Sequence, residues 1–340
     1  MVITLKPNKF VATLQDFIKN SRVMFNFEVR NEMLTIQILN DYTVVSRIPC
    51  NVIDNSGDAD NVSIWLTKSI LVLDKQADIK ITFTETAVLI EQDTFSGIFA
   101  REFEDRRTLP DIEDIELTQM FSNRLKFLAH TAVACGTLAK ELSIADPDPI
   151  FSNNLFYINY SQTWFVTSMK FPRISFPMST FRDFTFKLDE EAKYHYFEET
   201  STLYIQTIDY DFYIQSGNQS IDDTTITAVN KIMAGLQPVT NIRIMEYVGK
   251  LQTIAQAFPK QKFPLTIGDG KFSINANSNN QRITVGHVNN YALSIMITSA
   301  QLDVICKLFK EDESIEILRG VNCICLVSKE KNLLLAGMIS

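Results

Sequence analysis

The sequence predicts an α+β fold made of six copies of one small unit, in which a strand and an amphipathic helix are followed by several short strands. The last fifty residues show the unit most clearly. YALSIMI alternates polar and apolar residues, and Thr298 and Ser299 are suited to cap a helix. Leu302, Ile305 and Phe309 then recur at helical spacing. Three short runs rich in β-branched and apolar residues, SIEILRG, NCICLVS and NLLLAGMIS, predict the strands.

Five further copies precede this one, and they begin near Val2, Val62, Gln119, Phe184 and Ile242. In the copy that starts at Phe184 we expect the helix around residues 190–197. A unit this small cannot bury its own apolar face, so two copies must stack. Six copies therefore predict three tandem domains, which we place at residues 1–107, 108–234 and 235–340. The second linker is expected to hold a short helix around residues 229–234.

The composition is that of an ordinary globular protein, with 46% hydrophobic and 21% charged residues in a chain of 340. No apolar run approaches the ~20 residues needed to cross a bilayer, and no signal-peptide segment opens the sequence. We therefore expect a cytoplasmic protein with no membrane partner. The chain has five cysteines: Cys50, Cys135, Cys306, Cys323 and Cys325. They include no C-x-x-C pair, which favours buried structural thiols over a metal site.

The charge is distributed unevenly along the chain. The six windows in which we expect helices are residues 6–22, 67–80, 122–140, 187–199, 249–262 and 298–311. Together they carry +7, so the rest of a chain with net charge −8 carries −15. Basic helices on an acidic body suit a protein that contacts phosphates along its helices. The alternative is that lysine is enriched there because it is a good helix former, and the window 187–199, at −3, departs from the pattern.

The common catalytic motifs are missing from the sequence. It contains no P-loop, no G-x-G-x-x-G after a strand and no G-x-S-x-G elbow. His130, His195 and His287 lie far apart in the sequence. Asp209 and Asp211 could form a D-x-D metal pair in a hydrolase, although in a strand they would more simply be solvent-exposed residues on one face. We therefore expect no enzyme, no cofactor and no metal.

Four short strings carry a resemblance to a known family. RTLPDIEDIE at residues 107–116 resembles the family's first interdomain linker, and LQPV at residues 236–239 stands where its second linker ends. LTIGDGKFSINANS at residues 265–278 is similar to a hairpin of its third domain, and the ending GMIS resembles its apolar tail. In its repeat pattern and in these strings, the chain resembles the bacterial-type DNA sliding clamp, the β subunit of DNA polymerase III. VTSMKFPR stands where the family has Thr-Asp-Gly-His-Arg, as expected of a divergent member, such as one encoded by a phage.

The resemblance implies a DNA-clamp fold and a homodimeric ring, with sheets outside and helices lining a central hole. Such a ring encircles duplex DNA without sequence preference and tethers the replicative polymerase. The implied partners are duplex DNA, the polymerase, a clamp loader and a second copy of the chain, and no cofactor is implied. The alternative from another class is a phage structural or assembly protein built from β-rich repeats.

The resemblance also implies three sets of site residues. The basic residues expected on the helices that face DNA are Arg22, Lys68, Lys75, Arg124, Lys126, Lys140, Lys250 and Lys307. The pocket expected to bind a partner peptide comprises Thr167, Phe171, Pro172, Pro238, Val239, Met338 and Ile339. Phe99 and Phe258 are expected at the dimer interface.

Overall fold

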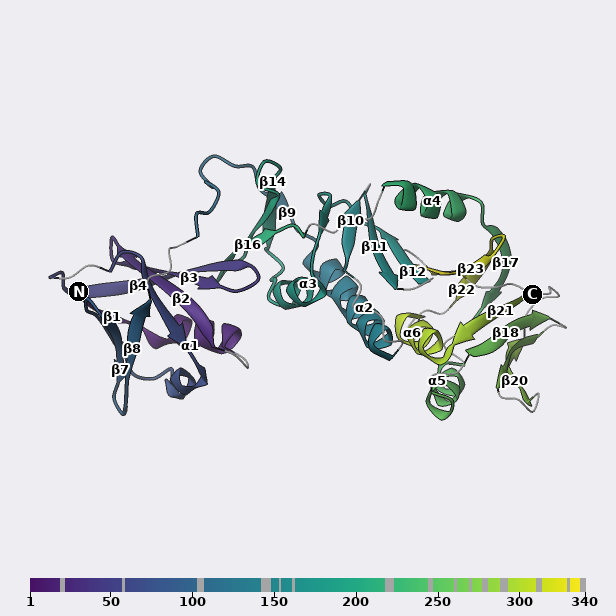
Figure 1. The fold of residues 1–340 in the computed structure, drawn as a ribbon, viewed down its shortest axis with the longest axis horizontal. Coiled ribbons are helices and arrows are strands. Elements are labelled where there is room, and N and C mark those ends of the chain that lie inside the picture. Colours follow the sequence, from purple (N-terminus) through teal and green to yellow (C-terminus); the bar gives the residue numbers. More distant parts are fainter. Residues whose placement is uncertain are drawn as a thin grey trace. The chain divides into compact units, whose positions relative to one another are not determined.

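The computed structural model describes most of the chain. The described residues are 1–18, 22–56, 59–102, 107–141, 148–152, 154–160, 163–217, 223–243, 247–259, 262–268, 271–276, 281–287, 293–309, 314–328 and 331–336. They form two compact units. The first unit is Met1–Ser122 with Leu188–Ser216, and the second is Asn123–Lys187 with Gly217–Ser340 (Figure 1).

The first unit is dominated by strands. Its elements are β1 (Val2–Leu5), α1 (Pro7–Phe17), β2 (Val23–Arg30), β3 (Met33–Leu39), β4 (Thr43–Asp54), β5 (Val62–Leu66), the 3-10 helix η1 (Lys68–Val72), β6 (Ile79–Phe83), β7 (Ala87–Gln92), β8 (Phe95–Glu102), β9 (Thr118–Gln119), β14 (Lys193–Phe197), β15 (Thr202–Gln206) and β16 (Asp211–Gln215). The first eight strands are paired in a closed cycle, because β1 pairs with both β4 and β6. The long strand β4 makes this closure possible, since its first half pairs with β3 and its second half with β1.

Helix α1 forms because its sequence has a residue suited to the helix start and an apolar face that can be buried. Pro7 occupies the first turn, where its missing N–H costs no hydrogen bond. Phe10, Leu14 and Phe17 then recur at helical spacing and are buried. The second predicted helix of this domain is only the five-residue η1, which buries Ile70 and leaves Val72 exposed.

The pairing of β4 with β16 extends the sheet of the first unit to twelve strands. Val45 lies opposite Asp211 and Thr43 opposite Tyr213. Asp211 is buried, and it pairs with the guanidinium of Arg47 and accepts a hydrogen bond from the Tyr204 hydroxyl (3.2 Å). A buried carboxylate needs such partners because desolvation would otherwise be costly. The ion pair therefore ties the N-terminal strands to β15 and β16.

The second unit contains the two longest of the described helices. Its elements are α2 (Ser122–Glu141), β10 (Ile150–Ser152), β11 (Leu155–Tyr160), β12 (Thr163–Ser168), β13 (Ile174–Ser175), α3 (Met178–Thr185), α4 (Asp223–Ala234), β17 (Gln237–Ile242), α5 (Val248–Ala257), β18 (Lys262–Gly268), β19 (Lys271–Ala276), β20 (Gln281–His287), β21 (Leu293–Thr298), α6 (Ser299–Phe309), β22 (Ile315–Arg319), β23 (Cys323–Ser328) and β24 (Lys331–Ala336). An eight-stranded sheet has the order β13-β10-β11-β12-β24-β23-β22-β17. A four-stranded sheet has the order β20-β19-β18-β21. The sequence prediction of an α+β fold is thus confirmed.

The C-terminal copy of the repeat forms as its sequence predicts. Thr298 and Gln301 make a reciprocal capping box, in which the Thr298 hydroxyl accepts from the Gln301 N–H (3.1 Å) and the Gln301 side chain accepts from the Thr298 N–H (2.8 Å). Leu302, Ile305 and Phe309 are buried on one face of α6. The three predicted strands follow as β22, β23 and β24.

Two predictions about helices need correction. The helix expected around residues 190–197 is wrong, because KYHYF alternates aromatic residues and forms β14, while the helix of that repeat lies earlier, at α3. The acidic window 187–199 is therefore not a helix, and the helix of that repeat, α3, carries one basic and one acidic residue, Arg182 and Asp183. The short helix expected around residues 229–234 is longer, and α4 packs Ile226 and Val229 against the eight-stranded sheet.

The Arg47–Asp211 pair predicts a measurable loss of stability. Replacing Arg47 with methionine leaves the buried Asp211 with Tyr204 as its remaining partner, and since Arg47 itself is half exposed we expect the free energy of unfolding to fall by about 2 kcal/mol. Urea denaturation measures this. The control is Lys6→Met, which breaks an exposed pair with Asp78 (3.0 Å) and should cost less than about 0.5 kcal/mol. Equal losses in the two variants would show that the Arg47 pair does not stabilise the junction.

Candidate DNA-facing and partner-binding surfaces

The eight basic residues expected to face DNA fall in different settings. Lys68 and Lys75 are exposed in and after η1. Arg22 lies over the Trp65 ring, with its guanidinium 4.6 Å from the ring centroid, and 3.4 Å from Glu102. Both contacts orient Arg22 while leaving it 58% exposed.

The remaining basic residues belong to the second unit. Arg124 in α2 donates to the Ser168 carbonyl, and Lys307 in α6 pairs with Asp303 at 2.6 Å. Lys250 in α5 lies 5.9 Å from the Tyr247 ring centroid. Lys126 is half exposed on α2, and the Lys140 side chain lies outside the described residues. Among the residues that the structure describes, no carboxylate lies within ion-pair distance of Lys75, Lys126 or Lys250, so these three keep a charge available for phosphates.

Strand β8 presents an open edge with apolar side chains. It pairs with β7 along residues 95–100, but β5 reaches only Arg101 and Glu102. In the described part of the chain, no strand pairs with the other side of β8 from Phe95 to Ala100. Ile98 is 73% exposed on this segment, and the rings of Phe95 and Phe99 close over Gly97, where an added Cβ would approach each to 2.9 Å. An apolar open edge of this kind is suited to pairing with a strand of another chain.

Phe258, the second residue expected at the dimer interface, follows α5. It is half buried, and its ring lies 6.2 Å from that of Phe263 on β18. This contact places Phe258 at the end of the helix layer, beside the four-stranded sheet.

The residues expected to form the peptide pocket are divided between two ends of the eight-stranded sheet. Thr163 lies opposite Leu335, Cys323 opposite Ala336 and Gln237 opposite Arg319, so β24 ends at the same end of the sheet at which β17 begins. Pro238 and Val239 lie at this end. Met338 and Ile339 fall outside the described residues.

Thr167, Phe171 and Pro172 are not brought together with Pro238. Thr167 lies toward the other end of β12, four strands from β17, which corresponds to about 19 Å across the sheet. Thr167 is buried, and Phe171 is buried against the Phe151 ring (centroids 4.6 Å apart). Pro172 is half exposed.

An exposed apolar residue that sequence reasoning missed lies near Pro238. Val321 is 90% exposed in the turn between β22 and β23, and the adjacent Gly320 packs against Leu236. Pro238 itself is exposed on the edge strand β17, where its missing N–H coincides with a bulge. We call Pro238, Val239 and Val321 the apolar corner. The Gly-Val-Asn signal of a turn at residues 320–322 could have predicted the exposure of Val321.

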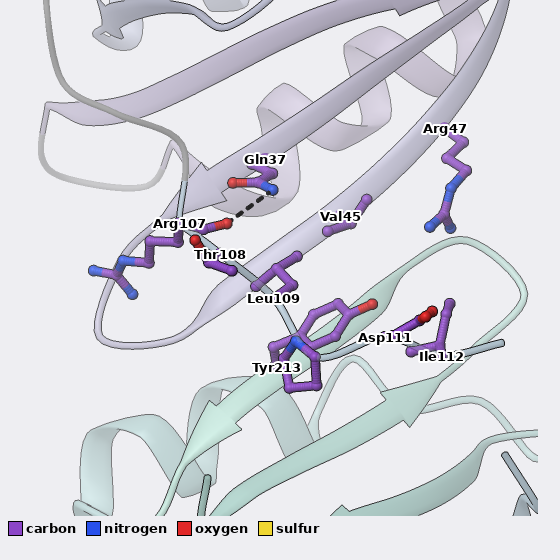
Figure 2. Close-up of a pocket in the computed structure, with 10 residues that line it drawn as sticks. Gln37, Val45, Arg47, Arg107, Thr108, Leu109, Asp111, Ile112 and Tyr213 are labelled. Atoms are coloured by element: carbon purple, nitrogen blue, oxygen red, sulfur yellow. Dashed lines mark hydrogen bonds between the residues drawn. The ribbon is translucent and has the colours of Figure 1, made fainter.

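A hollow of about 440 Å³ lies under the first linker. Figure 2 shows Leu109 of the linker between Val45 and Tyr213, and Leu109 and Ile112 pack against these two residues. The Arg107 guanidinium donates to the Thr43 hydroxyl (3.3 Å) and the Asn40 carbonyl (3.1 Å), which anchors the linker to the N-terminal strands. The hollow therefore lies where the linker, residues 107–116, crosses the β4–β16 junction.

The structure does not support the metal pair considered for Asp209 and Asp211. Asp211 is buried in its ion pair with Arg47, so the interpretation of both aspartates as solvent-exposed strand residues is wrong for Asp211. Asp209 lies before β16, exposed, 3.8 Å from Lys9. No cluster of potential metal ligands occurs within the described residues.

The cysteines behave as core residues where they are described. Cys50, Cys306, Cys323 and Cys325 are free and buried, while the Cys135 side chain lies outside the described residues. Burial raises the pKa of the Cys306 and Cys325 thiols to about 12. These two thiols are therefore protonated and unreactive at neutral pH. Within the described residues, no helix combines the length and apolarity that crossing a bilayer requires.

Comparison with solved structures decides the fold. A putative DNA polymerase III β subunit from Eubacterium rectale matches with a TM-score of 0.75 at 9% identity, over 99% of each chain. The fold is that of the bacterial sliding clamp. The DNA polymerase III β subunit of Pseudomonas aeruginosa matches with a TM-score of 0.74 at 11% identity, over 99% of this chain and 100% of that one. The Helicobacter pylori β clamp, solved bound to a DNA ligase peptide, matches with a TM-score of 0.68 at 12% identity and the same coverage.

The resemblance seen in the sequence is thus confirmed at the level of the fold. No protein-family model matches the sequence, and no curated protein sequence matches it significantly. The chain therefore has the clamp fold with a sequence that is only 9–12% identical to those of the three clamps compared.

Proposed function

We propose that the chain is a DNA polymerase processivity factor, a sliding clamp that closes around duplex DNA as a homodimeric ring of six domains. The observation that carries this proposal is the match of essentially the whole chain to whole β clamps, rather than of one domain to a part of them. The proposed domains are residues 1–107, 108–234 and 235–340. A ring that holds DNA by topology needs no base recognition and no catalytic residues.

The open edge of β8 supports a head-to-tail dimer. We propose that it pairs with the third domain of a second copy near Phe258. Because Ile98 is largely exposed, Ile98→Glu should leave the fold intact and place a charge in this interface. Ultracentrifugation should show a mass near 38.8 kDa for this variant and about twice that for the parent chain. Phe99→Glu should act in the same direction.

The matched control for this prediction is Ile208→Glu, which changes an equally apolar residue that is 66% exposed outside β8. This control should remain a dimer. A folded Ile98→Glu variant that kept the dimer mass would place the interface elsewhere.

We propose that the basic residues of the helices face the DNA. Loaded on a nicked circular duplex, the parent chain should stay bound at moderate salt and slide off when the circle is cut. Replacing Lys68, Lys75, Lys250 and Lys307 together with glutamate should greatly reduce the amount of protein loaded and retained on the circle, since each contributes a weak, salt-sensitive phosphate contact during loading. Gel filtration separates the circular DNA from free protein, and the amount of labelled protein that elutes with the DNA measures retention.

The control for this prediction is Lys231→Glu on α4. Figure 1 shows α4 and α6 on opposite sides of the eight-stranded sheet, so Lys231 of α4 lies on the side of this sheet away from α6. This variant should be retained like the parent chain. Retention of the fourfold variant would contradict the assignment, and release that does not depend on cutting the circle would contradict the clamp function itself.

We propose that a partner's peptide binds at the apolar corner together with Met338 and Ile339 of the C-terminal segment. An extended peptide of six residues spans about 20 Å, enough to reach from the apolar corner toward Thr167, Phe171 and Pro172. The partners would be the polymerase and the clamp loader. The Helicobacter pylori clamp bound to a ligase peptide supports this kind of partner.

Removing the last three residues should abolish binding of the partner polymerase in a calorimetric titration, because the apolar contacts of Met338 and Ile339 are lost. Val321→Asp should weaken the same binding at least about tenfold, because it places a charge in an apolar contact. Both variants should keep the thermal transition and the dimer mass, as should the control Ile208→Asp. Unchanged affinity in both would move the peptide site away from the apolar corner.

A further inference from the structure

Five side chains form a mixed aromatic and basic strip on α2 and at the end of α3. We call them the aromatic strip: Lys126, Phe127, His130, Arg182 and Phe186. Lys126, Phe127 and His130 fall on one face of α2, since residues three and four apart are neighbours on a helix. The His130 and Phe186 rings, whose centroids are 4.9 Å apart, join α2 to the end of α3. Arg182 precedes Phe186 by four residues and shares its face.

The two phenyl rings of the aromatic strip are partly exposed to solvent, unlike the apolar side chains beside them. Phe127 is 36% exposed and Phe186 43% exposed, whereas the neighbouring Leu128, Phe181 and Phe184 are fully buried. The core between α2 and α3 is thus filled by other residues. Exposed apolar side chains gathered on one surface indicate a binding function.

The charge of the aromatic strip is positive. Among the described residues, no carboxylate lies within ion-pair distance of Lys126 or Arg182. The nearest acidic residue in the sequence, Asp183, pairs with Lys187 at 3.0 Å, and the Lys187 side chain is only 10% exposed. The cations of the strip are therefore available to an anionic ligand.

Aromatic platforms beside unpaired cations match single-stranded nucleic acid. Bases stack on aromatic rings while lysine and arginine contact the phosphates. A duplex hides the faces of its bases, so its phosphates could use Lys126 and Arg182 but not the rings. An apolar peptide or a second copy of the chain would use the rings but would bury both cations without a partner.

Building on the proposed DNA-encircling function, we propose that the aromatic strip binds unpaired nucleotides of single-stranded DNA. In a clamp on a primed template, the strip would hold the single-stranded part next to the duplex. This contact adds base stacking on the Phe127 and Phe186 rings to the phosphate contacts of the basic helix residues, of which Lys126 is one.

The test uses the full chain and a fluorescein-labelled oligothymidine in an anisotropy titration. The double variant F127L/F186L keeps apolar side chains at both positions and removes the phenyl rings, so its affinity for oligothymidine should fall about tenfold or more. Its affinity for a duplex of the same length should change less than about twofold. The control V72A/I208A alters two residues that are each 66% exposed outside the strip, and it should bind oligothymidine like the parent chain.

Equal affinity of F127L/F186L and the parent chain for oligothymidine would overturn the proposal. So would the loss of the dimer mass in F127L/F186L, because the strip would then be a protein interface. K126E/R182E should also weaken oligothymidine binding, and unchanged binding in this variant would contradict the role of the cations. Retention of the parent chain on the nicked circle tests the clamp function separately, since F127L/F186L should be retained normally if only the strip is affected.

Discussion

The structure depends on two pairings between strands that are far apart in the sequence, β4 with β16 and β12 with β24. A single repeat has too few strands to bury its apolar face or to satisfy its edge hydrogen bonds. Each of the two pairings removes two edges at once. The Arg47–Asp211 ion pair and the packing of the first linker stabilise the β4–β16 pairing. Helix α4 packs on the eight-stranded sheet, which the β12–β24 pairing makes continuous.

The surfaces to which we assign functions are formed by different parts of the sheets. In the first unit the short reach of β5 leaves β8 with an open apolar edge, the feature from which we infer a second copy of the chain. In the second unit α4 covers one side of the eight-stranded sheet, and α2 and α6 with their basic residues lie on the other (Figure 1). The apolar corner lies at the end of the sheet, where β17 begins and β24 ends. Under the proposed function, these surfaces would give DNA, a second copy and a partner peptide separate sites on one chain.

Local patterns predicted the fold to a large extent. The alternation in YALSIMI, the cap at Thr298 and the helical spacing from Leu302 to Phe309 all specify their elements within a few residues, and the structure has those elements. The prediction failed for residues 190–197, where aromatic side chains were assigned to the apolar face of a helix. The alternating aromatic residues of KYHYF suit a strand and form β14, whereas the helix of that repeat, α3, follows directly after Pro177.

The candidate sites were less accessible to sequence reasoning because they depend on long-range register. The burial of Asp211 follows from its position opposite Val45, which lies more than 160 residues away. The separation of Thr167 from Pro238 follows from the order of five strands in one sheet. The exposure of Ile98 follows from the short reach of β5 along β8. None of these relations is local, so composition and spacing could not specify them.

Electron microscopy of the purified chain tests the central claim most directly. If the chain is a sliding clamp, single particles should be closed rings of two copies with a central hole at least about 20 Å wide, enough for a hydrated duplex to pass. Open filaments, shells or rings whose hole is too narrow for duplex DNA would contradict the account. Such assemblies would favour a structural protein built on the same fold.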